Sequence, residues 1–381
     1  MRPRLLFAAL STVLFLSGIR AAEKEYPPVN PALLYWQAAA MLPTLTDEQA
    51  TELRDMAAGK LPVDPAKATV LGSDASIHLI RKAALSSAPC DWGLAREDGP
   101  AMALPHLSKM RQLTSLALME SERQFLKGDS TSGIDWLLVA HRMARHSGAG
   151  DTLISFLVQE SGEESALRAA ARHCLGWDEN TRRQYAEKLN SLPLPHSLQD
   201  SYRGEKVFID WLGNLSARGD ETKRKLLTES LGSVNNEKES DQGKALHNLI
   251  SDPEAWRKEM TALYDFHSRT VAAFGKPWKE ASPELEAINA DIQSGDVILA
   301  KLSFPAVTSI HDRAFVTATL RTMLVAALDH GTQLDDTIVA TYHDAFDDNP
   351  LRLLKAEDGT LSLCSAGPHP KDKVIQLSLG K

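Results

Sequence analysis

A histidine and two glutamates near the middle of the chain have the types and spacing of a chemical site. Glu160 and Glu164 fall within the apolar stripe of a helix predicted from about residue 151 to residue 174. His141 falls within the apolar stripe of the preceding predicted helix. Carboxylates and a histidine that face each other between helices can hold a metal ion, or can act as an acid–base pair with shifted pKa values. The sequence therefore offers these three residues as candidate catalytic or metal-binding groups.

The same residues also have a purely structural interpretation, which we favour. Glu164 precedes Arg168 by four residues, the favourable order for an exposed ion pair on a helix. His141 can be a core histidine with hydrogen-bond partners. Gly162 can bend the helix and change which of its faces is buried. The Glu-x-x-His spacing that is typical of two-metal bundles is absent from the sequence.

A second candidate site is an acidic loop near the C-terminus, made of Asp344, Asp347, Asp348 and Asn349. Oxygen ligands of this kind suit calcium. The favoured interpretation is a solvated turn before Pro350, because Asp and Asn commonly begin such turns. Calcium is therefore the one cofactor to consider, and we otherwise predict none.

Motifs with a more specific chemical meaning are missing from the sequence. It has no Gly-Lys-Ser/Thr phosphate loop, no Gly-x-Ser-x-Gly turn, no His-Glu-x-x-His and no dinucleotide fingerprint. Cys90, Cys174 and Cys364 are an odd number of cysteines without zinc-ligand spacing. The sequence does not decide whether two of these cysteines form a disulfide. We expect Cys174, on an apolar helix face, to behave as a small buried hydrophobic residue.

The bulk composition indicates a folded protein with a large core. Of the 381 residues, 43% are hydrophobic and 24% are charged, and the net charge is −8. This acidic balance argues against nucleic acid as a partner, because binding to a phosphate backbone needs clustered Lys and Arg.

The first residues have the pattern of an export signal. Arg2 and Arg4 precede an apolar run over residues 5–19, and Ala21 and Ala22 offer a cleavage site. We expect a periplasmic or secreted protein with a signal peptide over residues 1–21. The alternative is an uncleaved N-terminal anchor, which would be the only contact with a membrane.

The remaining pattern is mainly helical and ends in strands. Three helices are expected between residues 107 and 174, one over 197–217 and one over 305–330, because apolar residues recur at three and four positions. A polar residue followed by proline predicts a helix start at Asn30-Pro31, Asp252-Pro253 and Ser282-Pro283. Asp358-Gly359 between two apolar runs predicts a hairpin, and residues 374–379 could add a third strand.

We therefore predict a mainly α fold, an irregular multi-helix array or bundle with a small C-terminal β-hairpin or three-stranded module. After the signal peptide, the predicted division is a helical domain over 22–190, a second helical domain over 191–335 and the β-rich module over 336–381. The boundary near residue 191 rests on the Leu-Pro-Leu-Pro run at 192–195, and the stretch 219–243 is polar and predicted to be a loop.

Two parts of the sequence resemble known groups of proteins. Residues 30–38, 153–158 and 166–168 are similar to a group of uncharacterised exported helical proteins of planctomycete and verrucomicrobial type, a resemblance that brings no activity with it. Residues 348–353, 358–363 and 365–368 resemble the C-terminal segment of type II secretion pseudopilins, which implies a small sheet with a calcium-binding loop. This chain departs from that pattern at residues 369–371, where His-Pro-Lys stands in place of acidic ligands.

From the sequence we expect an exported, non-catalytic helical protein with an interaction or envelope-support role, whose partner is another protein of the cell envelope. The alternative is an extracytoplasmic metal-dependent enzyme or hydrolase that uses His141, Glu160 and Glu164. The enzyme needs these side chains to be solvent-reachable in a concave pocket, whereas the interaction protein predicts an exposed apolar patch.

Overall fold

The computed structural model describes residues 28–64, 74–215, 248–303, 307–365 and 374–380, together with residues 67, 72, 222 and 225. These residues form a mainly α-helical fold with a small antiparallel sheet at the C-terminal end, as predicted. Among them, no helix combines the length and the apolar character that crossing a membrane requires. The predicted signal peptide, most of the stretch 219–243 and residues 369–371 lie outside the described residues.

The N-terminal half consists of short helices packed on a central group of long ones. The short elements are α1 (Pro31–Ala40), α2 (Asp47–Ala57), α4 (Asp74–Ala84) and η1 (Arg96–Ala101). The longer ones are α5 (Pro105–Leu126), α6 (Ser130–Gly148), α7 (Leu153–Cys174) and α8 (Glu179–Asn190). The predicted start at Asn30-Pro31 is confirmed, because Asn30 Oδ1 accepts a hydrogen bond from Ala32 N at 3.0 Å.

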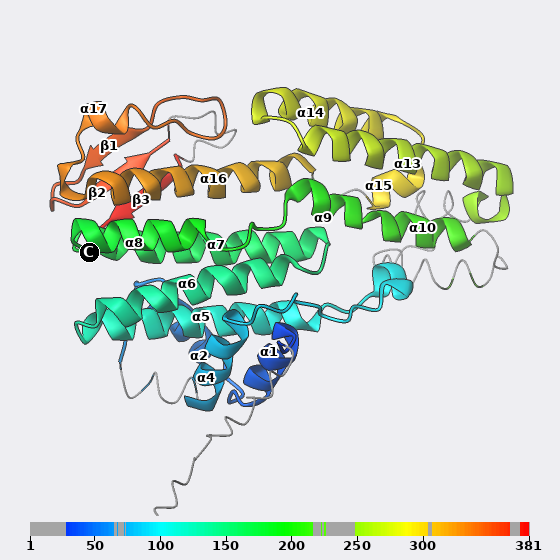
Figure 1. Cartoon of the computed structure of the whole chain (residues 1–381). Coiled ribbons are helices and arrows are strands. Elements are labelled where there is room, and N and C mark those ends of the chain that lie inside the picture. The colour runs from blue at the N-terminus through cyan, green and yellow to red at the C-terminus, as the bar shows by residue number, and fades with distance from the viewer. Residues whose placement is uncertain are drawn as a thin grey trace, which may run out of the picture.

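The C-terminal half contains a second group of helices and the sheet. Its helical elements are α9 (Leu198–Gly204), α10 (Lys206–Asn214), α13 (Pro253–Phe274), α14 (Trp278–Ser294), α15 (Ile298–Ser303), α16 (Val307–His330), η4 (Gly331–Gln333) and α17 (Asp336–Val339). Helices α5, α6, α7 and α16 lie side by side in successive layers, with α1, α2 and α4 beyond α5 (Figure 1).

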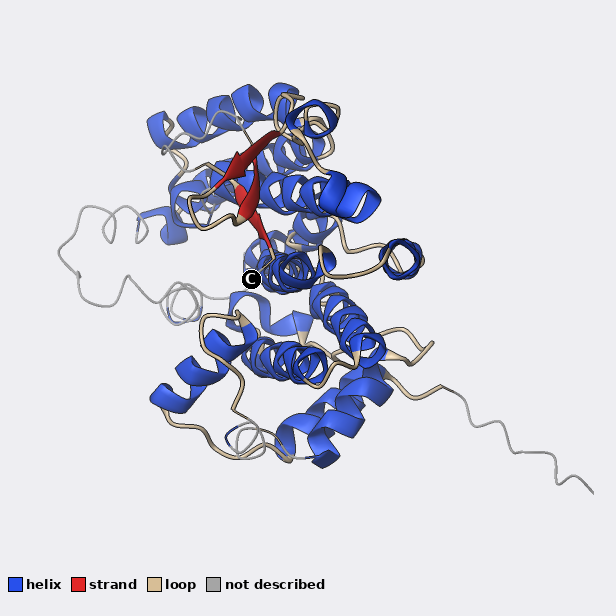
Figure 2. Ribbon diagram, turned by 90° about the vertical axis from the view of Figure 1, so that its left-hand side faces the viewer, coloured by secondary structure: helices blue, strands red, loops and turns tan. Residues whose placement is uncertain are grey.

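The predicted β module is a three-stranded antiparallel sheet in the order β1 (Arg352–Lys355), β2 (Leu361–Cys364) and β3 (Gln376–Leu379). The hairpin turn is the predicted one, with Gly359 at a φ of 87° that favours glycine. Strand β3 packs against α7 and α16, and Gly380 N donates to Ala171 O at 3.2 Å. Figure 2 shows the strands set among the helices, with the C-terminus close to them.

Three groups of buried apolar side chains hold these elements together. The largest includes residues from α1 through α8 and also from the C-terminal part of α16 and the sheet. Leu320 and Leu324 of α16, which fall in the second predicted domain, therefore share a core with the first. A second group joins α10 to α13, α14 and α15, and a third joins the N-terminal end of α7 to α9, α13, α14 and α16.

Two predicted elements differ from the structure. The predicted helix start at Ser282-Pro283 is wrong, because α14 already begins at Trp278 and Pro283 lies inside it. The single helix expected over residues 197–217 is interrupted at Glu205, which separates α9 from α10. A Cβ added at Gly204 would meet Asp151 O at 2.1 Å, so close contact with the start of α7 requires glycine there.

Candidate functional site

The structure places His141 in a buried contact between α6 and α7, and its carboxylate partner is Glu163. His141 Nδ1 lies 2.7 Å from Glu163 Oε2, and Nε2 lies 3.0 Å from the Tyr185 hydroxyl of α8. The His141 side chain is 0% exposed. Both ring nitrogens are thus engaged in a sealed position, which is the arrangement of a structural core histidine.

Arg145 completes this ion network from one turn further along α6. Its Nε donates to Glu163 Oε1 at 2.8 Å, and its Nη1 donates to Pro193 O. Burial would raise the pKa of Glu163, but His141 and Arg145 outweigh it and hold the pKa well below the usual range, at about 2. Glu163 is therefore an ionised partner that ties α6, α7 and the segment after α8 together.

The two predicted glutamates occupy different environments on α7. Glu160 is buried beside Gln159, whose Nε2 donates to it at 3.3 Å, and burial raises its pKa to about 7. Glu164 is half-buried and accepts from Arg168 Nε at 2.9 Å, so the predicted ion pair is confirmed. Glu164 also accepts from Arg313 of α16. The structure thus assigns Glu164 to a contact between helices.

In the acidic loop near the C-terminus, backbone N–H groups of the loop itself donate hydrogen bonds to the side chain of Asp344. Asp344 is buried, and its Oδ1 accepts from the backbone N–H groups of Phe346 and Asp347, each at 3.1 Å. Its Oδ2 accepts from Ser365 Oγ at 2.7 Å. Asp348 has a positive φ of 63° and lies 3.3 Å from His343 Nδ1. Within the described residues, no three His, Cys, Asp or Glu side chains gather in a way that could hold a metal ion.

The cysteines are separate from one another. Cys90, Cys174 and Cys364 are free thiols, and Cys174 is buried as expected. Burial raises the pKa of Cys90 and that of Cys174 to about 12, which disfavours the thiolate form of both.

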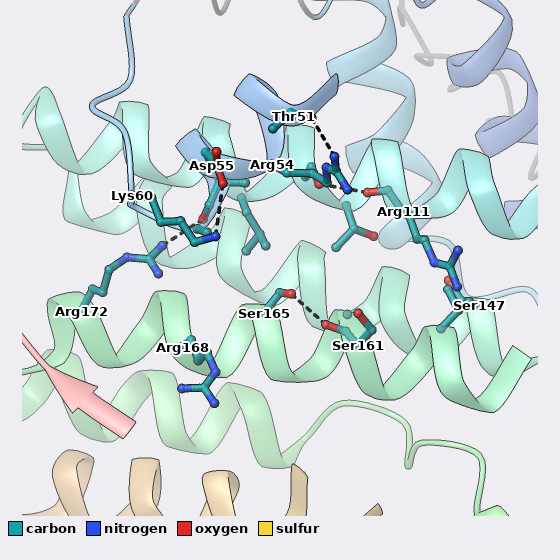
Figure 3. Close-up of a pocket in the computed structure, with 17 residues that line it drawn as sticks. Thr51, Arg54, Asp55, Lys60, Arg111, Ser147, Ser161, Ser165, Arg168 and Arg172 are labelled. Atoms are coloured by element: carbon teal, nitrogen blue, oxygen red, sulfur yellow. Dashed lines mark hydrogen bonds and ion pairs between the residues drawn. The ribbon is translucent and has the colours of Figure 1, made fainter. Parts of the chain in front are cut away.

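The structure reveals a groove that the sequence did not suggest as a site. It lies over α6, with α2 and α5 on one side and α7 on the other, and its volume is about 720 Å³ (Figure 3). A hypothetical Cβ at Gly162 would lie 2.8 Å from Ala144 Cβ, so α7 approaches α6 closely at the bottom of the groove. We call this hollow the basic groove, because five of its lining residues are cationic: Arg54, Lys60, Arg111, Arg168 and Arg172.

Two of these cations have no carboxylate partner among the described residues. Arg54 donates only to Ala50 O and Thr51 Oγ1 of its own helix, and Arg111 makes no side-chain hydrogen bond in the described part of the chain. Both side chains are exposed to solvent. In Figure 3 they come from the α2 and α5 side, facing Ser161 and Ser165 of α7.

The other three cations are partly neutralised. Lys60 Nζ lies 3.3 Å from Asp55, the one acidic residue among the described lining, and this pair is exposed. Arg172 pairs at 2.7 Å with buried Glu122, and Arg168 pairs with Glu164. An exposed ion pair such as Lys60–Asp55 is weak, so Lys60 can exchange Asp55 for an incoming anion at little cost in free energy.

Hydroxyl groups cover the walls of the basic groove between the cations. Ser115 and Ser165 donate to backbone carbonyls one turn earlier in their own helices, at 3.1 and 2.8 Å. The side chains of Thr114 and Ser161 have no hydrogen-bond partner within the described ranges. Apolar side chains, among them Leu118 and Val158, complete the lining. The groove can therefore offer charge, hydroxyl donors and apolar surface at once.

The sequence contains part of the pattern that forms the basic groove, but this pattern indicates a site only once the neighbouring helices are in place. Ser161, Ser165, Arg168 and Arg172 recur at intervals of four, three and four residues, which makes a polar stripe along α7. Such a stripe usually marks a solvated face. It becomes a site here only because α2 and α5 bring Arg54 and Arg111 to the same hollow.

Comparisons with known proteins add no further assignment. No family model, curated protein or solved structure matches this chain. The function must therefore be argued from the geometry of the described residues.

Proposed function

We propose that this protein is an exported, non-catalytic binding protein whose basic groove captures an acidic segment of another protein of the cell envelope. Export rests on the signal-like residues 1–21. The non-catalytic role is supported by the environment of His141, whose ring is sealed from solvent with both nitrogens engaged.

The observation that carries the proposal is the concentration of positive charge on an acidic protein. The chain has a net charge of −8, yet the described lining of the basic groove holds five cations and one carboxylate. A positive cleft on a negative molecule attracts acidic partners selectively and speeds their association.

The composition of the groove favours a peptide over a small inorganic anion. Its volume of about 720 Å³ is far larger than one phosphate or sulfate needs. The cations come from α2, the turn after it, α5 and α7, so one extended ligand would contact several of them. Leu118 and Val158 would contact aliphatic parts of such a segment, while hydroxyl groups would bond its backbone or carboxylates.

Fluorescence anisotropy with labelled hexaglutamate tests this proposal, with hexalysine and hexathymidylate as competing probes. We expect hexaglutamate to bind, and we expect its affinity to fall as the salt concentration rises. Salt screens exposed charges, and the screening length is about 8 Å at physiological ionic strength. The double variant Arg54→Glu, Arg111→Glu should lower the affinity at least tenfold.

The matched control is Lys82→Glu, Lys109→Glu, which makes the same change in net charge on α4 and α5 with exposed lysines outside the groove lining. This control should keep most of the affinity. Equal losses in both double variants would show a non-specific charge effect and overturn the proposal, as would hexathymidylate binding as tightly as hexaglutamate.

A further inference from the structure

A second, mainly apolar pocket lies at the other end of α7. It has a volume of about 380 Å³ and lies between the first turns of α7, helices α9, α10 and α13, and the segment that follows η1. In Figure 1 this region is on the right, where the short cyan helix η1 lies against α10. The volume is within the range of about 300–1,000 Å³ that is usual for small-molecule sites.

Two glycines shape the walls of this pocket. Gly99 has a φ of 58°, and a Cβ there would lie 2.4 Å from the Trp211 ring. The backbone of the turn in η1 is therefore in direct contact with this ring. Gly204, the last residue of α9, packs against Asp151 O, and the helix is interrupted at the next residue. This interruption sets Glu205 at the junction of α9 and α10, among the residues that line the pocket.

Glu205 is a carboxyl group in apolar surroundings with spare bonding capacity. Its Oε1 accepts a hydrogen bond from Leu153 N, at the start of α7, at 2.6 Å. Its other oxygen makes no hydrogen bond within the described residues, and no Lys or Arg is found in the described lining. Burial raises the pKa of Glu205 to about 7, only partly offset by the bond from Leu153.

Aromatic rings surround the remaining space. Tyr202, Phe208 and Trp211 line the pocket together with His267. The His267 ring stacks on Tyr202 at a centroid distance of 5.0 Å, and its Nε2 donates to Tyr202 O at 2.9 Å. Burial lowers the pKa of His267, which favours the neutral ring. Aromatic faces attract a cation, and they also bury an apolar ligand.

We propose that this pocket binds a small arylalkyl amine, with the ammonium group at the free oxygen of Glu205 and the ring among Tyr202, Phe208 and Trp211. Glu205 is the only carboxyl group in the described lining, and an ammonium group beside it favours its ionised form, so a cation is the head group that complements it. An anionic head would meet this carboxylate without a described cation to balance it. The site shares no described lining residue with the basic groove, and the two proposals stand independently.

Isothermal titration calorimetry with 2-phenylethylamine, 2-phenylethanol and phenylacetate tests this site on the full chain. The three probes share a ring and differ in the charge of the head group. We expect the amine to bind at least tenfold more tightly than the alcohol, and phenylacetate to bind most weakly.

The Glu205→Gln variant should remove the preference for the amine over the alcohol. Its amide oxygen can still accept from Leu153 N, so we expect the variant to fold, and a thermal melt checks this. Asp210→Asn is the matched control, because Asp210 of α10 pairs with Lys206 outside the pocket lining, and it should keep the preference. Equal binding of amine and alcohol to the unmodified chain, tighter binding of phenylacetate, or no binding of any probe would overturn the proposal.

Discussion

Glu163 of α7 and His141 of α6 form a buried contact, with 2.7 Å between Oε2 and Nδ1. Glu163 uses its other oxygen for Arg145, so one carboxylate links two residues that lie one turn apart on the facing helix. Tyr185 and Pro193 O extend the same network to α8 and the segment after it. These contacts fix the rotation of α6 against α7, and the two helices form the floor and one wall of the basic groove.

Glu163→Gln should lower the free energy of unfolding by about 3–5 kcal/mol, because removal of one partner from a buried ion pair leaves the other charge uncompensated. Here the guanidinium of Arg145, already with one unpartnered nitrogen among the described residues, would lose its carboxylate. Urea denaturation followed by circular dichroism measures the change.

The matched control is Glu164→Gln on the next residue of the same helix. Glu164 is half-buried and its pairs with Arg168 and Arg313 are partly exposed, so we expect a loss of about 1 kcal/mol or less. A loss from Glu163→Gln no greater than this would contradict a central structural role for the network.

The helices and the sheet were largely predictable, because apolar spacing and turn residues are local signals. The hairpin at Asp358-Gly359 and the start of α1 are both confirmed. The error at Ser282-Pro283 arose because a proline can also lie inside a helix at the loss of one backbone hydrogen bond, and Pro283 is the sixth residue of a helix that follows Pro277. The break at Glu205 follows Gly204, whose contact with Asp151 joins residues that are far apart in sequence.

The candidate site was only partly predictable, for the same reason. His141 was correctly placed on a buried face, but its partner Glu163 lies on a part of α7 that is buried because α7 packs against both α6 and α16. A single apolar stripe cannot describe a helix covered on two sides. One usable signal was missed, since His141 and Arg145 are four residues apart and therefore share one helix face.

Glu160 should make stability depend on pH in the opposite sense to Glu163. Its pKa is raised to about 7 by burial, above the unfolded value of about 4.5, so its favourable contribution is present below pH 4.5 and is lost as the pH rises through 7. A neutral amide at this position does not incur this loss, so Glu160→Gln should stabilise the protein at pH 8 by on the order of 3 kcal/mol. Melting temperatures between pH 4 and pH 9 measure the effect.

Glu163 supplies the internal comparison for this experiment. Its pKa is lowered, so its contribution is present above the unfolded value of about 4.5 and is lost as the pH falls toward 2. Glu160→Gln should therefore leave the acid limb of the stability profile unchanged and flatten only the limb above pH 5. If the melting temperature of Glu160→Gln changes with pH between pH 5 and pH 8 as steeply as that of the unmodified chain, Glu160 is ionised in the folded protein throughout that range.

Asp344 should act as a structural anchor of the loop before β1, independently of any cation. Its carboxylate accepts from two backbone N–H groups and from Ser365, so Asp344→Ala leaves three donors without their partner and should cost about 2–3 kcal/mol. We expect this loss to be equal in millimolar calcium and in chelator. The exposed neighbour Asp348 is the control. Asp348→Asn removes its charge and keeps a side chain that tolerates the positive φ, so it should change the melting temperature little. A melting temperature that rises with calcium in the unmodified chain, and no longer does so in Asp347→Ala, would instead establish the calcium site that the pseudopilin resemblance implies.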